Sequence, residues 1–149
     1  MAGFKTIHHQ LFANLDAGAL AGLASVAREI SLPAGGRICA YGDQGDEIFF
    51  VRRGRVHALL PLAGGRSHHI ATFCRGDFFG ERAFLDREMR SANLSAATAV
   101  ELYALSRARF DALVKTNAAL GREVFEALAF AISKRLRVAD TELRLLEER

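Results

Sequence analysis

The sequence predicts an α+β fold: a small antiparallel β-roll, jelly-roll-like in form, with an N-terminal helix and two C-terminal helices. Three observations lead to this prediction. The middle of the chain consists of short β-branched, aromatic and leucine-rich runs broken by glycine, which is typical of strands joined by tight turns. No long helical segment separates these runs, so a βαβ sheet is not expected. Both flanking regions carry apolar residues at helical spacing.

Length and composition favour a single domain. The chain has 149 residues, half of them apolar, which is enough to bury a substantial core. We divide it into an N-terminal helical segment at 1–32, a β-roll at 33–107 and C-terminal helices at 108–149. The net charge of +3 is distributed among mixed charges without a long block of one sign. This pattern favours a solvated surface over nucleic-acid binding.

The first elements of this fold are indicated by caps and breakers. Asp16 is a suitable N-cap, and Pro33 with the following glycines ends the helical pattern. The apolar positions that recur at helical spacing between them are Leu20, Leu23, Ala24, Ala27 and Ile30. The pair Gly64–Gly65 between two apolar runs predicts a hairpin turn. The runs that we expect to form strands are 37–41, 47–54, 55–62, 68–73 and 99–105.

Two helices are predicted after the roll. Ser106 is a suitable N-cap for a helix that ends near 117, and a long second helix follows from 118. The second helix carries one apolar stripe with spacings of three and four residues. Its members are Phe125, Leu128, Ile132, Leu136, Ala139, Leu143 and Leu146.

Several features point to a cytoplasmic chain, or to the cytosolic part of a membrane protein. The N-terminal residues lack the apolar centre of a signal peptide, and no run reaches the roughly 18 apolar residues of a membrane span. Cys39 and Cys74 lie in apolar surroundings without CxxC spacing, so we expect reduced core residues.

Catalytic and metal-binding patterns do not stand out. The histidines of the pairs His8–His9 and His68–His69 are adjacent, so their side chains diverge in extended backbone, and we predict surface histidines and no metal site. No Ser/His/Asp or paired-carboxylate arrangement is evident, so we predict neither enzymatic activity nor a cofactor.

The stretch "GDFFGERAFLDREMRSAN" at 76–93 is unusual for a turn between strands. Its centre, 80–86, is long enough for one or two helical turns, and the N-terminus of a helix attracts anions. Gly80 permits close backbone approach, and Arg90 adds a planar fork of donors suited to phosphate. Glu81 would be out of place at a bare phosphate site, so it implies a ligand that also carries hydroxyl groups. This combination predicts a nucleotide with one phosphate.

These residues resemble the phosphate-binding cassette of cyclic nucleotide-binding domains, the family of the catabolite activator protein, kinase A regulatory subunits and cyclic nucleotide-gated channels. The family pattern runs Phe-Gly-Glu, a short apolar helix, then Arg-(Ser/Thr/Ala)-Ala, and it stands here at 79–81 and 90–92. The glycine-studded segment 33–56 and the segment 101–113 are also similar to the family. The resemblance covers about 11–137, with the cassette at 78–92.

The resemblance implies a role for each cassette residue. Glu81 would accept a hydrogen bond from the ribose 2′-OH, and Arg90 would pair with the cyclic phosphate. The remaining residues implied in ligand binding are Gly80, the backbone N–H groups of Arg82 and Ala83, Ser91, and Ala58 and Ile70 on the apolar wall. Arg82 departs from the family, which has an apolar residue there; an inward side chain would change the charge of the pocket. Ser91 favours cAMP, with cGMP as the alternative.

What the domain regulates is left open at this stage. The chain ends within a predicted helix, where the transcription factors of the family continue into a winged helix-turn-helix, so we expect no DNA binding by this chain and no membrane insertion. We expect a module that couples cyclic nucleotide binding to movement of the C-terminal helices, as part or partner of a larger bacterial protein. Residues 130–134 are predicted to close over the purine, leaving 136–146 for a homodimer or an attached effector. The alternative is a dimerisation or interaction module of the same fold that binds no nucleotide.

Overall fold

The computed structural model describes residues 15–149 and confirms the predicted α+β class. Two four-stranded antiparallel sheets form the roll, with strand orders β1-β8-β3-β6 and β2-β7-β4-β5. In chain order the elements are α3 (Ala17–Val26), β1 (Arg28–Leu32), β2 (Arg37–Cys39), β3 (Glu47–Arg53), β4 (Val56–Pro61), η1 (Ala63–Gly65), β5 (Ser67–Phe73), β6 (Phe78–Phe79), α4 (Glu81–Asp86), β7 (Asn93–Ala96), β8 (Val100–Ser106), α5 (Arg107–Thr116) and α6 (Ala118–Glu147).

Strand β3 is buried on both faces of its sheet over residues 48–51. Ile48 and Phe50 of β3 pack against the helices, in a cluster with α3, α5 and α6. Phe49 and Val51, on the alternate face, pack inside the roll against the second sheet. This double burial explains why β3 is a continuous apolar run rather than an alternating one.

The N-terminal helix is shorter than the sequence predicts. Asp16 is its N-cap, as expected, and its carboxylate accepts a hydrogen bond from the Ala19 N–H. The helix ends at Val26, and residues 28–32 form β1, which pairs with β8. The assignment of Ala27 and Ile30 to the helix was therefore wrong. Ile30 matches helical spacing by coincidence, because it packs with Leu32 at a spacing of two residues against the roll interior.

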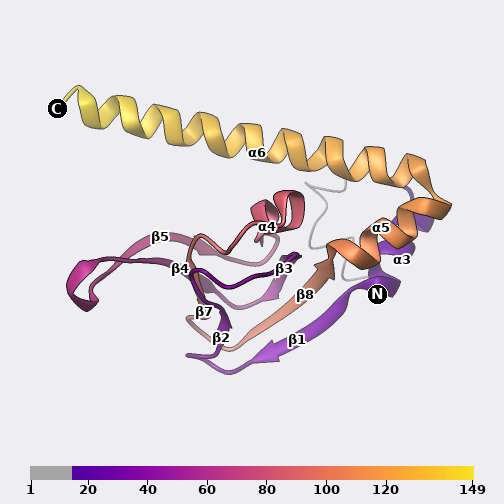
Figure 1. The fold of residues 1–149 in the computed structure, drawn as a ribbon, viewed down its shortest axis with the longest axis horizontal. Coiled ribbons are helices and arrows are strands. Elements are labelled where there is room, and N and C mark those ends of the chain that lie inside the picture. Colours follow the sequence, from indigo (N-terminus) through magenta and orange to yellow (C-terminus); the bar gives the residue numbers. More distant parts are fainter. Residues whose placement is uncertain (1–14) are drawn as a thin grey trace.

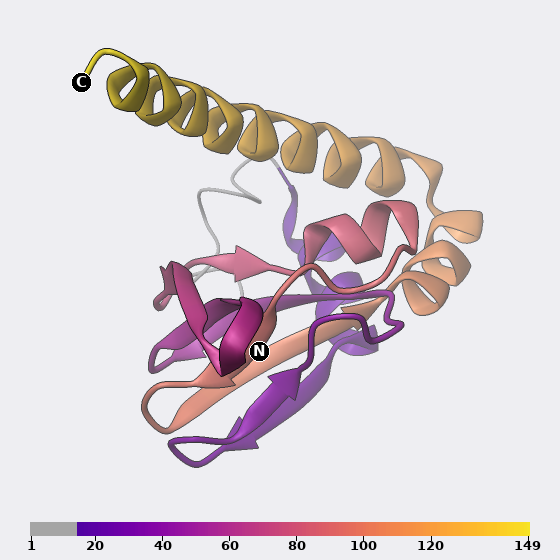
Figure 2. The same ribbon diagram turned by 60° about the vertical axis from the view of Figure 1, so that its left-hand side comes forward.

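The hairpin and the C-terminal helices agree with the sequence. Gly64 and Gly65 both have positive φ, at 75° and 73°, in the connection between β4 and β5. Ser106 caps α5 by accepting from the Arg109 N–H. Helix α6 begins at Ala118 and passes over α4, which lies between it and the strands (Figures 1 and 2).

The cysteines differ in part from expectation. Both are free thiols, but Cys74 is exposed and Cys39 is only half-buried, so neither is a fully buried core residue. Cys74 lies in the turn between β5 and β6, where its backbone N–H donates to Asp77.

The second histidine pair lies on the surface as predicted, with His68 and His69 exposed on β5. The ring of His69 lies edge-on to that of His57, with centroids 5.0 Å apart. His8 and His9 fall outside the described residues. Within residues 15–149, no helix is sufficiently long and apolar to cross a membrane.

Candidate functional site

The site is built where β6 turns into α4. Strand β6 pairs with β3, and the chain then bends sharply at Gly80, which is the N-cap of α4. Gly80 has φ +81°, and a Cβ there would lie 2.8 Å from Arg90 Nη1 and 2.9 Å from the carbonyl oxygen of Glu47. Both the conformation and the space therefore require glycine at this position.

Arg90 is the buried centre of the site. Its residue is 7% exposed, and its Nη2 donates to the Glu47 carbonyl at 2.9 Å. Its Nη1 reaches the Gly80 carbonyl at 3.4 Å, and the guanidinium lies 5.3 Å from the centroid of the Phe49 ring. Gly45 covers the other side, where a Cβ would lie 2.8 Å from Nε. The guanidinium is thus held in one orientation by strand β3, the turn at Gly80 and the loop at Gly45.

The charge of Arg90 has no carboxylate partner among the residues that the structure describes. None of the ion pairs formed within residues 15–149 includes this side chain. Two carbonyl oxygens use only part of the five N–H donors of a guanidinium. Burial of a cation is costly unless an anion compensates it. This arrangement is therefore suited to receive an anionic ligand.

Cys39 lies close enough to Arg90 to be influenced by its charge. Burial raises the pKa of the Cys39 thiol, and the positive Arg90 guanidinium offsets that effect only in part. The side chain is consequently a neutral thiol at physiological pH, and it adds no negative charge beside Arg90.

Glu81 faces the C-terminal helix. Its side chain is 17% exposed, and its Oε1 lies 3.1 Å from Nη1 of Arg135 on α6. Arg135 also donates from Nη2 to the Phe78 carbonyl at 2.6 Å, and its guanidinium stacks 3.9 Å from the centroid of the Phe78 ring. Arg135 therefore connects α6 to residues on both sides of Gly80, namely Phe78 and Glu81.

Sequence reasoning missed Arg135, although a signal was present. Arg135 follows the buried Leu128 by seven residues, which is two helical turns, so the two side chains lie on the same face of α6. A charged residue on the inward face of a helix normally has a specific partner. That partner, Glu81, is 54 residues earlier in the chain.

The two residues predicted for the apolar wall differ in burial. Ala58 is buried in the roll interior. Ile70 is 51% exposed and lies at a β-bulge, since Ala58 pairs with Ala71 while Leu59 pairs with His69. Such bulges redirect a side chain relative to the regular sheet.

Within the cassette, the side chains of Arg82 and Ser91 are exposed and that of Ala83 is buried. The exposure of Arg82 corresponds to the outward orientation, one of the two that the sequence left open. The backbone N–H groups of Arg82 and Ala83 lie in the first turn of α4, where a helix offers donors without partners of its own.

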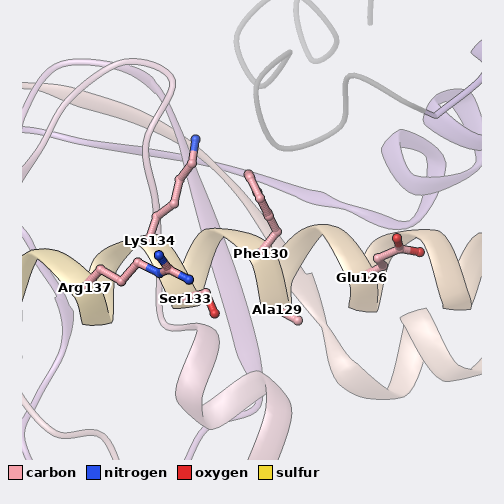
Figure 3. A pocket seen from close by; sticks show the side chains of 6 residues that line it. All are labelled: Glu126, Ala129, Phe130, Ser133, Lys134 and Arg137. Atoms are coloured by element: carbon pink, nitrogen blue, oxygen red, sulfur yellow. The ribbon is translucent and has the colours of Figure 1, made fainter.

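The predicted closure of residues 130–134 over the purine stays a prediction, and in this structure Phe130 is 64% exposed. Figure 3 shows the side chains of Phe130 and Lys134 projecting from α6 beside a pocket of about 640 Å³. Phe130 is two residues from Leu128, so helical geometry places it on the opposite face. The residues of this pocket are Glu126, Ala129, Phe130, Ser133, Lys134 and Arg137. No residue of the cassette lines it, and Arg135 of α6 contacts the cassette instead.

Comparison with known proteins agrees with this geometry. The family model described as "Cyclic nucleotide-binding domain" matches residues 29–117. A cyclic nucleotide-gated potassium channel of Rhizobium etli is 36% identical over 107 residues, which cover 72% of this chain and 28% of the channel. The chain therefore spans less than a third of the length of that relative.

Solved structures show the same fold. The catabolite activator protein of Thermus thermophilus superposes with a TM-score of 0.81 at 33% identity, over 93% of this chain and 63% of that one. A cyclic nucleotide-binding domain from Methylobacillus flagellatus gives a TM-score of 0.84, over 98% of this chain and 84% of that one. Its identity is 22%, so this second likeness concerns the fold alone.

Proposed function

The chain belongs to the cyclic nucleotide-binding domain family, whose domains are regulatory rather than catalytic. We propose that it binds cAMP in the cassette, with cGMP as the alternative ligand. We further propose that ligand binding changes the position of its C-terminal helices. The observation that carries the proposal is the burial of Arg90 with two carbonyl partners and no carboxylate within residues 15–149. A cyclic phosphate supplies the missing negative charge, and the planar guanidinium can bond two of its oxygens.

The phosphate has further donors nearby. The N–H groups of Arg82 and Ala83 at the start of α4 are proposed to bind it together with Arg90, while Gly80 keeps the backbone close. The side chain of Arg82 is exposed, so we assign it no role. Ser91 follows Arg90 and is proposed to lie beside the phosphate, and Ala58 and Ile70 are proposed to line the wall for sugar and base.

Glu81 is the proposed acceptor for the ribose 2′-OH. The contact with Arg135 is made through Oε1, and a carboxylate has about four lone-pair positions on its two oxygens. Glu81 can therefore bond Arg135 and a hydroxyl group at the same time. The ribose and the helix α6 would then share one carboxylate.

The shared carboxylate provides the proposed coupling to α6. Arg135 contacts Glu81 and Phe78, which flank the proposed phosphate position at Gly80. A ligand bound there would lie beside both Glu81 and Phe78. It would therefore change the strength of their contacts with Arg135, and with it the free energy of packing α6 against the roll. Nucleotide would act by population shift, because it would bind more tightly to the conformation of the domain with one position of α6 than to a conformation with another.

A second candidate function is supported by the distal half of α6. The apolar side chains of this half are exposed, and they include Leu136, Val138, Leu143, Leu145 and Leu146. An exposed set of this size on one helix marks an interaction surface. We propose that it contacts a second copy of the chain or an attached effector in the cytoplasm. This surface would serve a pure interaction module equally well, so nucleotide binding is the property that distinguishes the two functions.

Hydrogen exchange with and without cAMP tests the proposed function. Saturating cAMP is expected to slow amide exchange in residues 78–92, because the cassette is ordered by the phosphate, and also in 118–140, because Arg135 transmits the change. The matched control is Arg135→Ala, which should retain the effect at 78–92 and lose most of that at 133–140, around the Arg135 contact. Protection confined to the cassette in the wild-type chain would contradict the coupling, and no change anywhere would contradict binding.

A further inference from the structure

We propose that Arg107, the first residue of α5, is the positioning residue that holds the cassette helix α4 and the long helix α6 together. The inference rests on the proposed function and extends it to the regulation of the same site. The Arg107 side chain is only 20% exposed although it begins a surface helix. It contacts α4 and α6 at the same time.

The first set of contacts is with the C-terminal end of α4. Nη1 of Arg107 donates to the carbonyl oxygens of Phe84 and Leu85, at 2.8 Å and 3.2 Å. These carbonyls belong to the last turn of a six-residue helix, where carbonyl groups have no partner within the helix. A cation at this end also interacts favourably with the helix dipole. Arg107 therefore caps α4 from outside.

The orientation of Arg107 is fixed by Asp111, one turn later on α5. Nε of Arg107 donates to Asp111 Oδ1 at 2.9 Å, and Nη2 of Arg87 donates to Oδ2 of the same carboxylate at 2.9 Å. Arg87 is the C-cap of α4, with φ 60°. The Asp111 carboxylate on α5 thus binds two arginines. Arg107 donates to the last turn of α4, and Arg87 is the C-cap of that helix. This arrangement fixes α4 to α5.

The second set of contacts continues to α6. The Arg107 guanidinium lies 5.6 Å from the centroid of Phe84 on α4 and 5.1 Å from that of Phe125 on α6. Phe110 completes the group, with ring centroids 5.4 Å from both Phe84 and Phe125. Phe84 and Phe110 are fully buried. A displacement of α4 therefore cannot occur without moving the contact between Arg107 and Phe125.

Arg107 and Arg135 act at opposite ends of α4. Arg135 contacts Glu81, the first residue of the helix, which is also the proposed ribose acceptor. Arg107 contacts the last turn, away from the proposed ligand groups. The nucleotide would bond Glu81 beside Arg135, whereas no proposed ligand group contacts Arg107. A movement of α4 on ligand binding would then reach residues 121–132 of α6 through Arg107 and residues 133–140 through Arg135.

The test uses Arg107→Met in the full chain. Methionine retains most of the packing volume against the phenylalanines and removes the charge and the hydrogen bonds. The matched control is Arg109→Met on the same helix. Arg109 is exposed, and its side chain donates to the Val26 carbonyl of α3 at 3.4 Å, outside the α4–α6 junction. Arg107→Lys, which keeps the charge without the planar fork, is the second variant if the methionine variant does not fold.

Amide exchange is measured first without nucleotide. Arg107→Met is expected to accelerate exchange about tenfold in 81–90 and in 121–132, the factor that corresponds to losing one charge-assisted hydrogen bond. Arg107→Lys should show a smaller increase in the same two segments, and Arg109→Met should show none there. A uniform increase over the whole chain, or no increase in 121–132, would overturn the proposal, since a merely structural arginine would give one of these results.

The second measurement adds saturating cAMP. In Arg107→Met the cassette is expected to gain protection as in the wild-type chain, whereas 121–132 is expected to lose its response. An unchanged response of 121–132 would overturn the proposal. If the wild-type chain itself does not respond to cAMP, the proposed function fails, and the nucleotide-free comparison still decides the role of Arg107.

Discussion

Replacing Arg90 with alanine is expected to weaken cAMP binding by roughly 2–5 kcal/mol, the cost of leaving a buried charge without its partner. In the wild-type chain the Arg90 guanidinium is already oriented by the carbonyl oxygens of Glu47 and Gly80. Little conformational entropy is therefore lost when it binds the phosphate. Isothermal calorimetry measures the change in affinity directly.

Arg82→Ala is the matched control for Arg90→Ala, because Arg82 belongs to the same cassette and its side chain is exposed. It should bind cAMP with nearly the wild-type affinity. Circular dichroism of both variants verifies that they are folded. Equal affinity for Arg90→Ala and the wild-type chain would show that the phosphate does not bind at Arg90.

Replacing Glu81 with alanine is expected to abolish the discrimination between cAMP and its 2′-deoxy analogue. In the wild-type chain the analogue should bind more weakly by about 1.5–3 kcal/mol, the value of a hydrogen bond to a charged group. The Glu81→Ala variant lacks the acceptor, so both ligands should bind it with similar affinity. Competition titrations with the two nucleotides provide the measurement.

The ion pair between Glu81 and Arg135 requires a second variant in the same experiment. Glu81→Ala removes both the proposed ribose acceptor and the partner of Arg135. Arg135→Ala removes the ion pair and keeps the acceptor, so it should preserve the difference between the two ligands. If Arg135→Ala abolished that difference and Glu81→Ala preserved it, Glu81 would not be the acceptor of the 2′-OH.

The cassette was predictable from the sequence because its determinants are local. Gly80, Glu81 and Arg90 lie within eleven residues, and the conformation of Gly80 is a property of the backbone at that point. The turn that follows is equally local, since α4 ends at Asp86 and its C-cap Arg87 has a left-handed conformation. Short-range spacing is therefore sufficient to identify the residues of this segment.

The surroundings of the cassette were not predictable in the same way. The guanidinium of Arg90 is oriented by Glu47, which is 43 residues earlier, and Glu81 contacts Arg135, which is 54 residues later. Such contacts depend on how the sheets and helices pack. Hydrophobic periodicity also gave the wrong element at Ile30. This position fits both the spacing of the preceding helix and the two-residue spacing of the strand that it forms.

Calorimetric titration of the wild-type chain with cAMP tests the central claim most directly. The account predicts one site per chain with a dissociation constant on the order of micromolar, equivalent to about −8 kcal/mol, and somewhat weaker binding of cGMP. The absence of binding heat and of any thermal shift with either nucleotide at millimolar concentration would contradict it, and would leave the exposed half of α6 as the functional surface of the chain.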